Sequence, residues 1–391
     1  MTETKSIDSD RLLLPLQLVV WANTAAVAGV IASLAELRNE LGISESRIGL
    51  IVAAGFLTSF VAQVTLAPLA DMGRGRMMAV VGTIVAALAL ASMARSEGFV
   101  SWLLSRGALG VGAGLVLPSM RRSATTLDPA RSGEHLSRLV VAEILAFVFG
   151  PVVFALGIHF GGLRLPFAVF AGLMLLAVPV ALRLPEDRGR KSTQRERSLP
   201  LLVNRRLRGA LILVLGYFLL IGAFESLLPL MLDDRGSGPL MTGCAISLIA
   251  LPILLVGRTA GRMADRHGGL AMAMVGMVVA AIGSGLYGVV PGVLPLMTVI
   301  AAVGIFDGFG FIGGQVVVSR SVPEERQAGA LGLMGAAEVL GAGFAAYPSA
   351  LLYERIDIGW LWVAISGASL SLLAIGFLHV RSTRPLSGPG R

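Results

Sequence analysis

The chain has 391 residues, of which 55% are apolar and 14% are charged, and its net charge is +8. Its mean hydropathy of +0.80 is too high for a soluble globular protein. The basic residues are spread over short loops instead of forming one continuous basic segment, so the positive charge does not indicate a nucleic-acid partner. A single cysteine, Cys244, excludes an intramolecular disulfide and a thiolate metal cluster.

Twelve apolar segments follow one another along the chain, each long enough to cross a bilayer core ~30 Å thick as a helix. We therefore predict an all-α fold, a polytopic membrane protein with an even number of spans and both termini on one side. The predicted helices cover residues 12–36, 47–70, 77–94, 99–120, 134–160, 165–184, 209–232, 240–262, 270–289, 293–317, 328–351 and 359–380.

Basic residues are distributed unequally between the two sets of loops. Because Arg and Lys concentrate on the cytoplasmic side of membrane proteins, this distribution predicts cytoplasmic termini in the cell membrane. The basic set includes Arg74, Arg76, Arg121, Arg122, Arg262, Arg266, Arg320, Arg326 and the C-terminal arginines. The opposite loops carry Arg38, Arg47, Arg95, Arg164, Arg235 and Arg355.

Landmarks in the first half of the chain recur in the second half at a nearly constant offset. The pairs Asp71/Asp265, Gly49/Gly243 and Gly110/Gly304 lie 194 residues apart, and Glu143/Glu338 lie 195 apart. Such a long offset indicates a duplicated unit. We predict one bundle over residues 1–184, a cytoplasmic linker over 185–208 and a second bundle over 209–391. The basic linker is interpreted as a solvated connection, with binding to anionic lipid headgroups as the alternative.

Two charged turns share a motif. Leu66–Arg76 reads L-A-P-L-A-D-M-G-R-G-R, and Gly261–Gly269 reads G-R-M-A-D-R-H-G-G. Both resemble the signature G-x-L-A-D-R-x-G-R-R of the major facilitator superfamily. The matching residues are Leu69, Ala70, Asp71, Arg76, Gly261, Ala264, Asp265, Arg266 and Gly268. The chain departs from the signature at Ala67, Met72 and Gly269, where the family has glycine, arginine and a basic residue.

Two further motifs strengthen this resemblance. The fourth segment carries Arg106, Gly110 and Gly112 at the family's R-x-x-x-G-x-G spacing. The fifth segment carries Gly150-Pro151, the core of a signature associated with antiporters. That signature is incomplete, because Ala146, Phe154 and Ala155 stand where glycines would be expected.

The resemblance implies two six-helix bundles related by a pseudo-twofold axis along the membrane normal, with a central cavity that opens alternately to each side. It also implies a gating role for the charged turns. A carboxylate near a helix N-terminus and arginines from adjacent loops make contacts in one state that separate in the other. The alternative is that these residues only stabilise tight loops. The gating residues are Asp71, Arg74, Arg76, Asp265 and Arg266.

Few carboxylates lie at membrane depth, where each costs ~2.5–3.5 kcal/mol on insertion scales and is a functional candidate. Glu143 and Glu338 stand in the matching contexts V-V-A-E-I-L and G-A-A-E-V-L, and glycines flank Asp307. We expect the three to face the central cavity and to carry protons, or in the case of Asp307 a cationic group. The alternative is that neighbouring helices hold them. Glu36, at the end of the first segment, is expected to face water.

Other polar side chains complete the predicted cavity. Arg106 is expected to pair with Glu143 or with an anionic substrate, unless it makes a structural bond within its own half. Asn23 and Tyr217, which lie 194 residues apart, are expected to line the cavity, and Glu225 its mouth.

These features favour a secondary transporter driven by the proton gradient, exporting small hydrophobic or cationic compounds by proton antiport. A proton-coupled uptake symporter and an anion or metabolite transporter remain as alternatives. A membrane-embedded enzyme is disfavoured, because the histidines lie near helix ends and no nucleotide-binding fingerprint has the required context. A non-transporting sensor is disfavoured, because the sequence shows neither a loss of cavity polarity in one half nor a sizeable soluble domain. We expect no metal, no cofactor and a monomer in the bilayer, with protons and a small-molecule substrate as partners.

Overall fold

The computed structural model describes residues 2–66, 69–127, 131–184, 199–323 and 326–382. Within these ranges the regular elements are helices, and no strand occurs. Most of the predicted linker 185–208 lies outside the described residues. At its described end, Leu199–Val203 forms a 3-10 helix and a long α-helix begins at Arg205.

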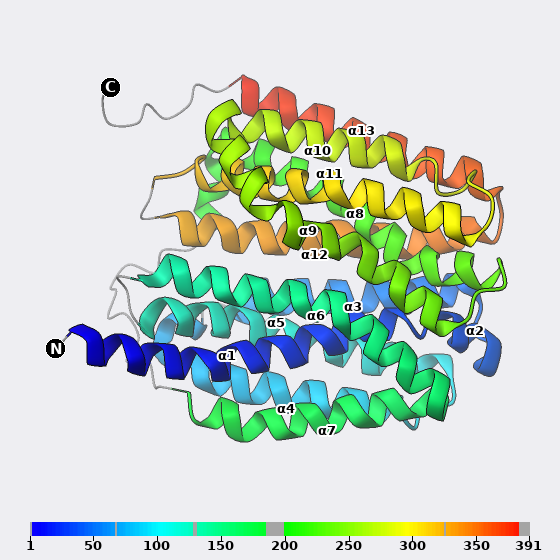
Figure 1. The fold of residues 1–391 in the computed structure, drawn as a ribbon, viewed down its shortest axis with the longest axis horizontal. Helices are drawn as coiled ribbons and strands as arrows, with labels where there is room; N and C mark the ends of the chain where they lie inside the picture. The colour runs from blue at the N-terminus through cyan, green and yellow to red at the C-terminus, as the bar shows by residue number, and fades with distance from the viewer. Residues whose placement is uncertain (1, 67–68, 128–130, 185–198, 324–325, 383–391) are drawn as a thin grey trace. The chain divides into compact units, whose positions relative to one another are not determined.

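The described residues form thirteen α-helices (Figure 1). Eleven of them are long and apolar enough to cross a bilayer; α10 is apolar but has 16 residues, and α2 is short. The all-α membrane fold is confirmed. The helices are α1 (Thr2–Ile31), α2 (Leu34–Leu41), α3 (Glu45–Leu66), α4 (Gly75–Met93), α5 (Phe99–Leu127), α6 (Ser132–Gly161), α7 (Arg164–Leu182), α8 (Arg205–Asp233), α9 (Pro239–His267), α10 (Gly269–Ser284), α11 (Val293–Ser319), α12 (Gln327–Tyr353) and α13 (Ile358–Arg381).

Internal contacts divide the chain into two units, which we describe separately. Unit 1 consists of Met1–Gln194 and Leu232–Ser247, and unit 2 consists of Arg195–Met231 and Leu248–Arg391. The end of α8 and the beginning of α9 therefore belong to unit 1. The Ser247 hydroxyl of α9, for example, donates a hydrogen bond to the Val148 carbonyl of α6 at 2.5 Å. The domain limits that the sequence suggests, at residues 184 and 209, stay a prediction.

The first predicted helix, 12–36, is interrupted in the structure. α1 ends at Ile31, and the Ser33 hydroxyl bonds back to the Val30 carbonyl at 2.7 Å. The separate helix α2 then ends at Leu41. The next residue, Gly42, has a left-handed backbone (φ +62°) that lets its N–H cap the helix. Glu36 therefore lies inside α2 and is half-buried, whereas the sequence suggested a water-facing helix end.

α10 is shorter than its predicted range of 270–289. The N–H groups of Leu286 and Tyr287 bond to carbonyls three residues back, so tighter turns replace the α-helix beyond Ser284. These turns place Tyr287 in the interior of unit 2, where 2% of its surface is exposed.

Glycine pairs allow close approach between helices within each unit. In unit 1, a Cβ built on Gly110 of α5 would lie 2.1 Å from the Gly55 carbonyl oxygen of α3. In unit 2, a Cβ on Gly276 of α10 would lie 2.2 Å from the backbone nitrogen of Gly310 of α11. Backbones that touch in this way are typical of helix packing in lipid, where dispersion contacts replace the hydrophobic effect as the driving force.

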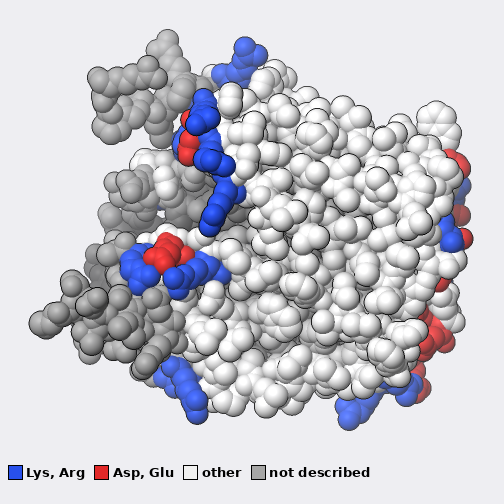
Figure 2. All heavy atoms as spheres, viewed as in Figure 1, with Lys and Arg blue, Asp and Glu red and all other residues white. Residues whose placement is uncertain are grey.

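The surfaces of the helices fit a lipid environment. In Figure 2, the charged side chains in view gather near the helix ends of each unit, and the helix walls between the ends are uncharged. Large apolar side chains stand outward on these walls, including Leu104, Leu176 and Leu255, which are 67%, 71% and 76% exposed. Such surfaces are stable against hydrocarbon but not in water.

Candidate functional site

Asp307, in the middle of α11, is a deeply buried carboxylate that has a polar partner. It is 3% exposed and belongs to unit 2. The Tyr217 hydroxyl of α8, also 3% exposed, forms a hydrogen bond with its carboxyl group. Within the described residues, the oxygen Oδ2 of Asp307 has no hydrogen-bond partner. A buried carboxyl group is thus held at one oxygen and left open at the other.

Asp307 borders a small cavity of about 10 Å³ in unit 2. Its lining is almost entirely apolar, with Ser284 and Tyr287 as the other polar residues. Since a water molecule needs ~10–15 Å³ of such volume, the cavity has room for about one water. It is too small for a substrate, but its walls surround Asp307 with apolar side chains.

Glu338 joins this group from α12. It is half-buried, and its charge acts on Tyr217 more weakly than that of Asp307 does. The structure therefore brings together three of the predicted cavity residues, from three helices of unit 2. We refer to Tyr217, Asp307 and Glu338 as the acidic triad.

Glu143 of unit 1 does not reproduce the surroundings of the acidic triad. Its carboxylate accepts hydrogen bonds from Arg121 of α5 at 3.0 and 3.2 Å. The Arg121 side chain is 41% exposed and that of Glu143 is 19% exposed. The neighbouring helix therefore holds Glu143 in an ion pair. The partner is not Arg106, which lies fifteen residues earlier on α5 and so ~22 Å away along the helix.

Arg106 is nevertheless buried, with 2% of its surface exposed. Its guanidinium lies over Gly55 of α3, where a Cβ would come within 2.6 Å of Arg106 Nε. A glycine at position 55 thus provides the space that this side chain occupies. The position of Gly55 in the sequence gives no indication of this role.

Asn23 and Glu225 are buried as well. Asn23 of α1 is 1% exposed, and within the described part of the chain neither atom of its side-chain amide has a hydrogen-bond partner. Glu225 of α8 is 5% exposed. A buried amide with an unused donor and an unused acceptor can bind a polar solute that offers the complementary pair.

The two charged turns are described to different extents. In unit 2, Arg320 at the end of α11 donates to Asp265 at 2.9 Å, and both side chains are more than half exposed. Arg266 occupies the last turn of α9. In unit 1 the backbone of Ala70–Arg74 forms one π-helical turn, in which Gly73 has φ +83°. The side chain of Asp71 lies outside the described set.

The basic partner of Asp265 is thus an arginine that the motif did not include. Arg320 is outside the signature, but it belongs to the basic loops that predicted the topology. The sequence did not predict a second polar cluster, in which Arg38 of α2 binds Asp233 and Asp234 at the end of α8, almost 200 residues away. No short-range pattern could have indicated that contact.

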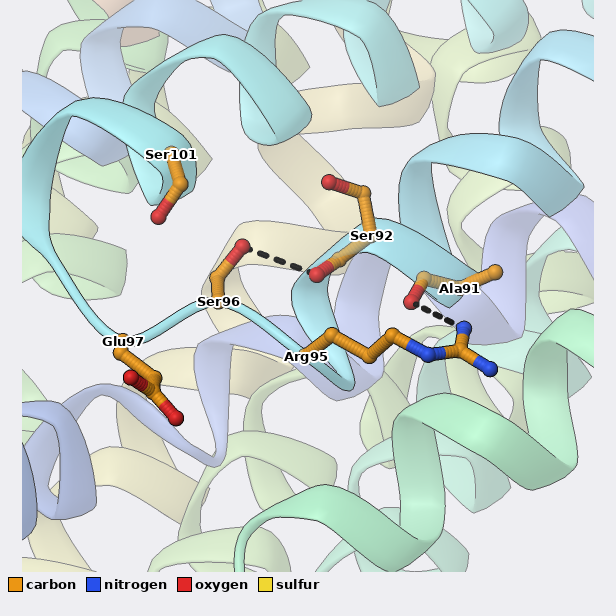
Figure 3. Close-up of a pocket in the computed structure, with 6 residues that line it drawn as sticks. All are labelled: Ala91, Ser92, Arg95, Ser96, Glu97 and Ser101. Carbon is orange, nitrogen blue, oxygen red and sulfur yellow. Dashed lines mark hydrogen bonds between the residues drawn. The ribbon is translucent and has the colours of Figure 1, made fainter.

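A larger hollow of about 380 Å³ lies at the turn between α4 and α5 in unit 1 (Figure 3). It is open to the outside. Arg95 donates to the Ala91 carbonyl at 3.4 Å and Ser96 to the Ser92 carbonyl at 2.8 Å, so these side chains bond to their own helix. We do not assign this hollow as a substrate site. Among the described residues, no group of three or more His, Cys, Asp or Glu is placed to hold a metal ion.

Comparisons with known proteins agree with this architecture. A family model described as Major Facilitator Superfamily matches residues 16–260 and 212–390. No curated protein matches the chain. The fold is similar to that of the nucleoside transporter NupG, with a TM-score of 0.77 and 15% identity, over 95% of this chain and 100% of that one.

The fold is also similar to that of a bacterial homolog of the human lysosomal transporter Spinster, in an inward-facing and unoccupied conformation. The TM-score is 0.76 and the identity 14%, over 96% of this chain and 97% of the other. At these identities, the likeness establishes the fold. The family and both similar structures are those of transporters, which agrees with the expectation that the chain is not an enzyme.

Proposed function

The chain belongs to the major facilitator superfamily, and from this premise we propose that it is a proton-coupled secondary transporter that works by alternating access. In this proposal it lies in the cell membrane with both termini in the cytoplasm and exports small hydrophobic or cationic compounds by proton antiport. The positive-inside distribution of Arg and Lys supports the orientation.

The observation that carries the coupling assignment is the burial of Asp307 with one oxygen unpartnered. An ionised carboxylate with an open oxygen in apolar surroundings is costly, whereas the protonated carboxyl group is not. The Tyr217 hydroxyl donates a hydrogen bond to one carboxyl oxygen, and the other oxygen, Oδ2, is open to receive a proton. We therefore assign Asp307 as the proton acceptor and Tyr217 as the group that orients it.

Antiport requires that the proton and the substrate compete. A deprotonated Asp307, with Glu338 acting on the same tyrosine, would give unit 2 a local negative charge that attracts a cationic group. Protonation removes that attraction and favours release of the cation. The acidic triad thus supports a cationic or neutral hydrophobic cargo, exchanged for protons.

A second candidate is uptake of a neutral or anionic polar solute. Arg106 is a buried cation and Asn23 a buried amide with an unused donor and acceptor, which suits a solute with a carboxylate or a heteroaromatic ring. One of the similar structures is a nucleoside transporter, and a nucleoside is a polar solute of this kind. This candidate places recognition on unit 1 and leaves proton coupling on unit 2.

The two candidates are separated by transport assays in proteoliposomes with an imposed pH gradient. The panel contains hydrophobic cations, nucleosides and organic anions. Asp307→Asn and Tyr217→Phe are expected to abolish or strongly reduce proton-driven transport while leaving substrate exchange at equal pH on both sides. Glu338→Gln is expected to weaken coupling, and Glu97→Gln, at an exposed loop position, is the matched control.

Glu143→Gln tests whether coupling needs both symmetry-related glutamates. Because Arg121 already neutralises Glu143, we expect proton-driven transport to persist in this variant. If Asp307→Asn and Glu338→Gln both transport against the pH gradient like the wild type, the assignment of coupling to unit 2 is wrong. If nucleosides or anions are accumulated and cations are ignored, the export proposal yields to the second candidate.

A further inference from the structure

A cluster of charged side chains joins α2 to the end of α8 within unit 1. Arg38 Nη2 of α2 donates to Asp233 Oδ2 at 2.5 Å and to Asp234 Oδ1 at 2.6 Å. Its Nη1 donates to Glu45 Oε1 of α3 at 3.2 Å. Asn39 adds hydrogen bonds to both carboxylate oxygens of Asp233 at 3.1 Å. We call these five residues the α2–α8 clamp.

The Arg38 guanidinium is well suited to the centre of the clamp. Its side chain is 19% exposed, so its contacts are screened less by water than those of a surface pair. Burial alone would lower the pKa of Arg38, but the hydrogen bonds to Asp234 and Asp233 outweigh it and raise the pKa above its ordinary value. The guanidinium stays charged, and the strength of the clamp depends on its acidic partners.

The clamp holds a segment that is connected to both units. α8 belongs to unit 2 up to Met231 and to unit 1 from Leu232 onward. Asp233 is the last residue of this helix. Release of Asp233 and Asp234 from Arg38 would therefore remove the hydrogen bonds that hold the end of α8 on α2.

Glu36 lies beside the clamp, two residues before Arg38 on α2. It is half-buried, and within the described structure its Oε2 has no hydrogen-bond partner. Burial raises the pKa of Glu36 to about 7; a hydrogen bond from its own backbone N–H opposes this shift, and the charges of Asp233 and Glu40 add to it. Glu36 therefore gains or loses a proton near neutral pH.

The groups around Glu36 are mainly acidic, so its charge is repelled. The described side chains of α1 contribute no charged group. The other charged groups of this region are Arg38 and Glu40 of α2, Glu45 of α3, Asp233 of α8, and Asp234 and Arg235 in the turn that follows.

We propose that Glu36 is a proton-binding site that controls the α2–α8 clamp: with the proton bound, the end of α8 stays on α2, and loss of the proton releases it. An ionised Glu36 repels Asp233, the carboxylate that Arg38 and Asn39 both hold. This proposal does not depend on Asp307 or on which substrate is transported. In the orientation proposed above the clamp faces the exterior, where a lower pH would keep it closed.

The sign of the pH dependence follows from linkage. In the clamped form burial and the charge of Asp233 raise the Glu36 pKa to about 7, and a released form without Asp233 nearby loses that charge's contribution, so the clamped form binds the proton more tightly. The ratio of clamped to released molecules therefore falls as pH rises toward and through about 7. Above about pH 8 the ratio no longer changes.

The distance between two spin labels, measured by double electron–electron resonance on the purified full chain, tests the proposal. Labels are attached at Arg47→Cys of α3 and Gly238→Cys in the turn after α8, in a Cys244→Ser background that removes the native cysteine. Arg47 is exposed, and a Cβ at Gly238 meets no atom within 4 Å. For the wild-type clamp we expect one short distance at pH 5 and a growing population of longer distances toward pH 8.

The Glu36→Gln variant has no titratable group at position 36, so we expect it to keep the short distance at every pH. Arg38→Gln is expected to give long distances at every pH, and Asp234→Asn is a milder variant with the same direction if Arg38→Gln does not fold. Glu97→Gln and Asp307→Asn are expected to respond to pH like the wild type, and the latter separates this result from the coupling proposal.

Three outcomes overturn the proposal. The first is a wild-type distance that does not change between pH 5 and pH 8.5. The second is a Glu36→Gln variant with the wild-type pH response, which would assign the response to another group. The third is a short distance at every pH in both Arg38→Gln and Asp234→Asn, which would show that the clamp does not hold α8.

Discussion

Substitution of Gly276 by alanine tests how closely α10 and α11 must approach. A Cβ at this position would lie 2.2 Å from the Gly310 nitrogen, 2.5 Å from its Cα and 2.6 Å from the Phe306 carbonyl oxygen. All three atoms belong to the backbone of α11, so no side chain can rotate away to make room. Ordinary contact begins near 3.4 Å, and the helices must therefore separate by about 1 Å.

Separation on this scale has an energetic and a functional consequence. Overpacking of a well-packed core costs about 1–3 kcal/mol, and here the loss of helix–helix dispersion contacts adds to it. Phe306 is the direct neighbour of Asp307 in the chain, so movement of α11 also shifts Asp307 relative to Tyr217. We expect Gly276→Ala to be both less stable and less well coupled.

The assay is thermal unfolding of the purified protein in detergent, followed by transport under a pH gradient. A change of 1 kcal/mol corresponds to roughly 2–4 °C in Tm for a domain of about the size of one unit. Gly257→Ala is the matched control, because a Cβ there meets no atom closer than 3.9 Å. Equal Tm values for Gly276→Ala, Gly257→Ala and the wild type would refute the close approach of α10 and α11.

Other substitutions test separate parts of the structure. Tyr217→Phe removes the hydrogen bond to Asp307 and should lower the free energy of unfolding by about 1–3 kcal/mol, measured by thermal unfolding. An unchanged value would mean that Tyr217 and Asp307 are not hydrogen-bonded. Asp357→Ala removes the N-cap of α13, whose Oδ1 accepts from Gly359 N at 2.9 Å; it should cost ~1 kcal/mol, and Asp357→Ser should recover most of it. In a double-mutant cycle, Arg121→Gln and Glu143→Gln should show a coupling below about 1 kcal/mol, because Arg121 is 41% exposed; a larger value would mean a buried pair. Asp265→Asn should leave Tm nearly unchanged, since its contact with Arg320 is exposed, and should alter transport rates only if the turn has a gating role.

Several features of the acidic triad were accessible from the sequence. Asp307 could be recognised as a candidate because a carboxylate within an apolar, glycine-rich segment is rare and costly. Tyr217 followed from the 194-residue repeat, which pairs it with Asn23. The cavity beside Asp307 and the reach of Glu338 to Tyr217 were not accessible, because they depend on how α8, α11 and α12 face one another.

The same repeat was misleading about Glu143 and Glu338. Their sequence contexts match, yet Glu143 pairs with Arg121 whereas the charge of Glu338 acts on Tyr217. A duplication preserves the positions of residues on a helix. It does not by itself preserve their neighbours, which the side chains of the facing helices provide.

The sequence by itself determined the helical membrane architecture and the family. Hydrocarbon provides no hydrogen-bond partners for the backbone, so long apolar segments must form helices, and the basic loops carry the topology signal. Tertiary structure alone decided which polar groups meet. The lipid-facing and protein-facing sides of these helices are both apolar, so periodicity cannot tell which side of α2 receives Asp233 or that Gly55 makes room for Arg106.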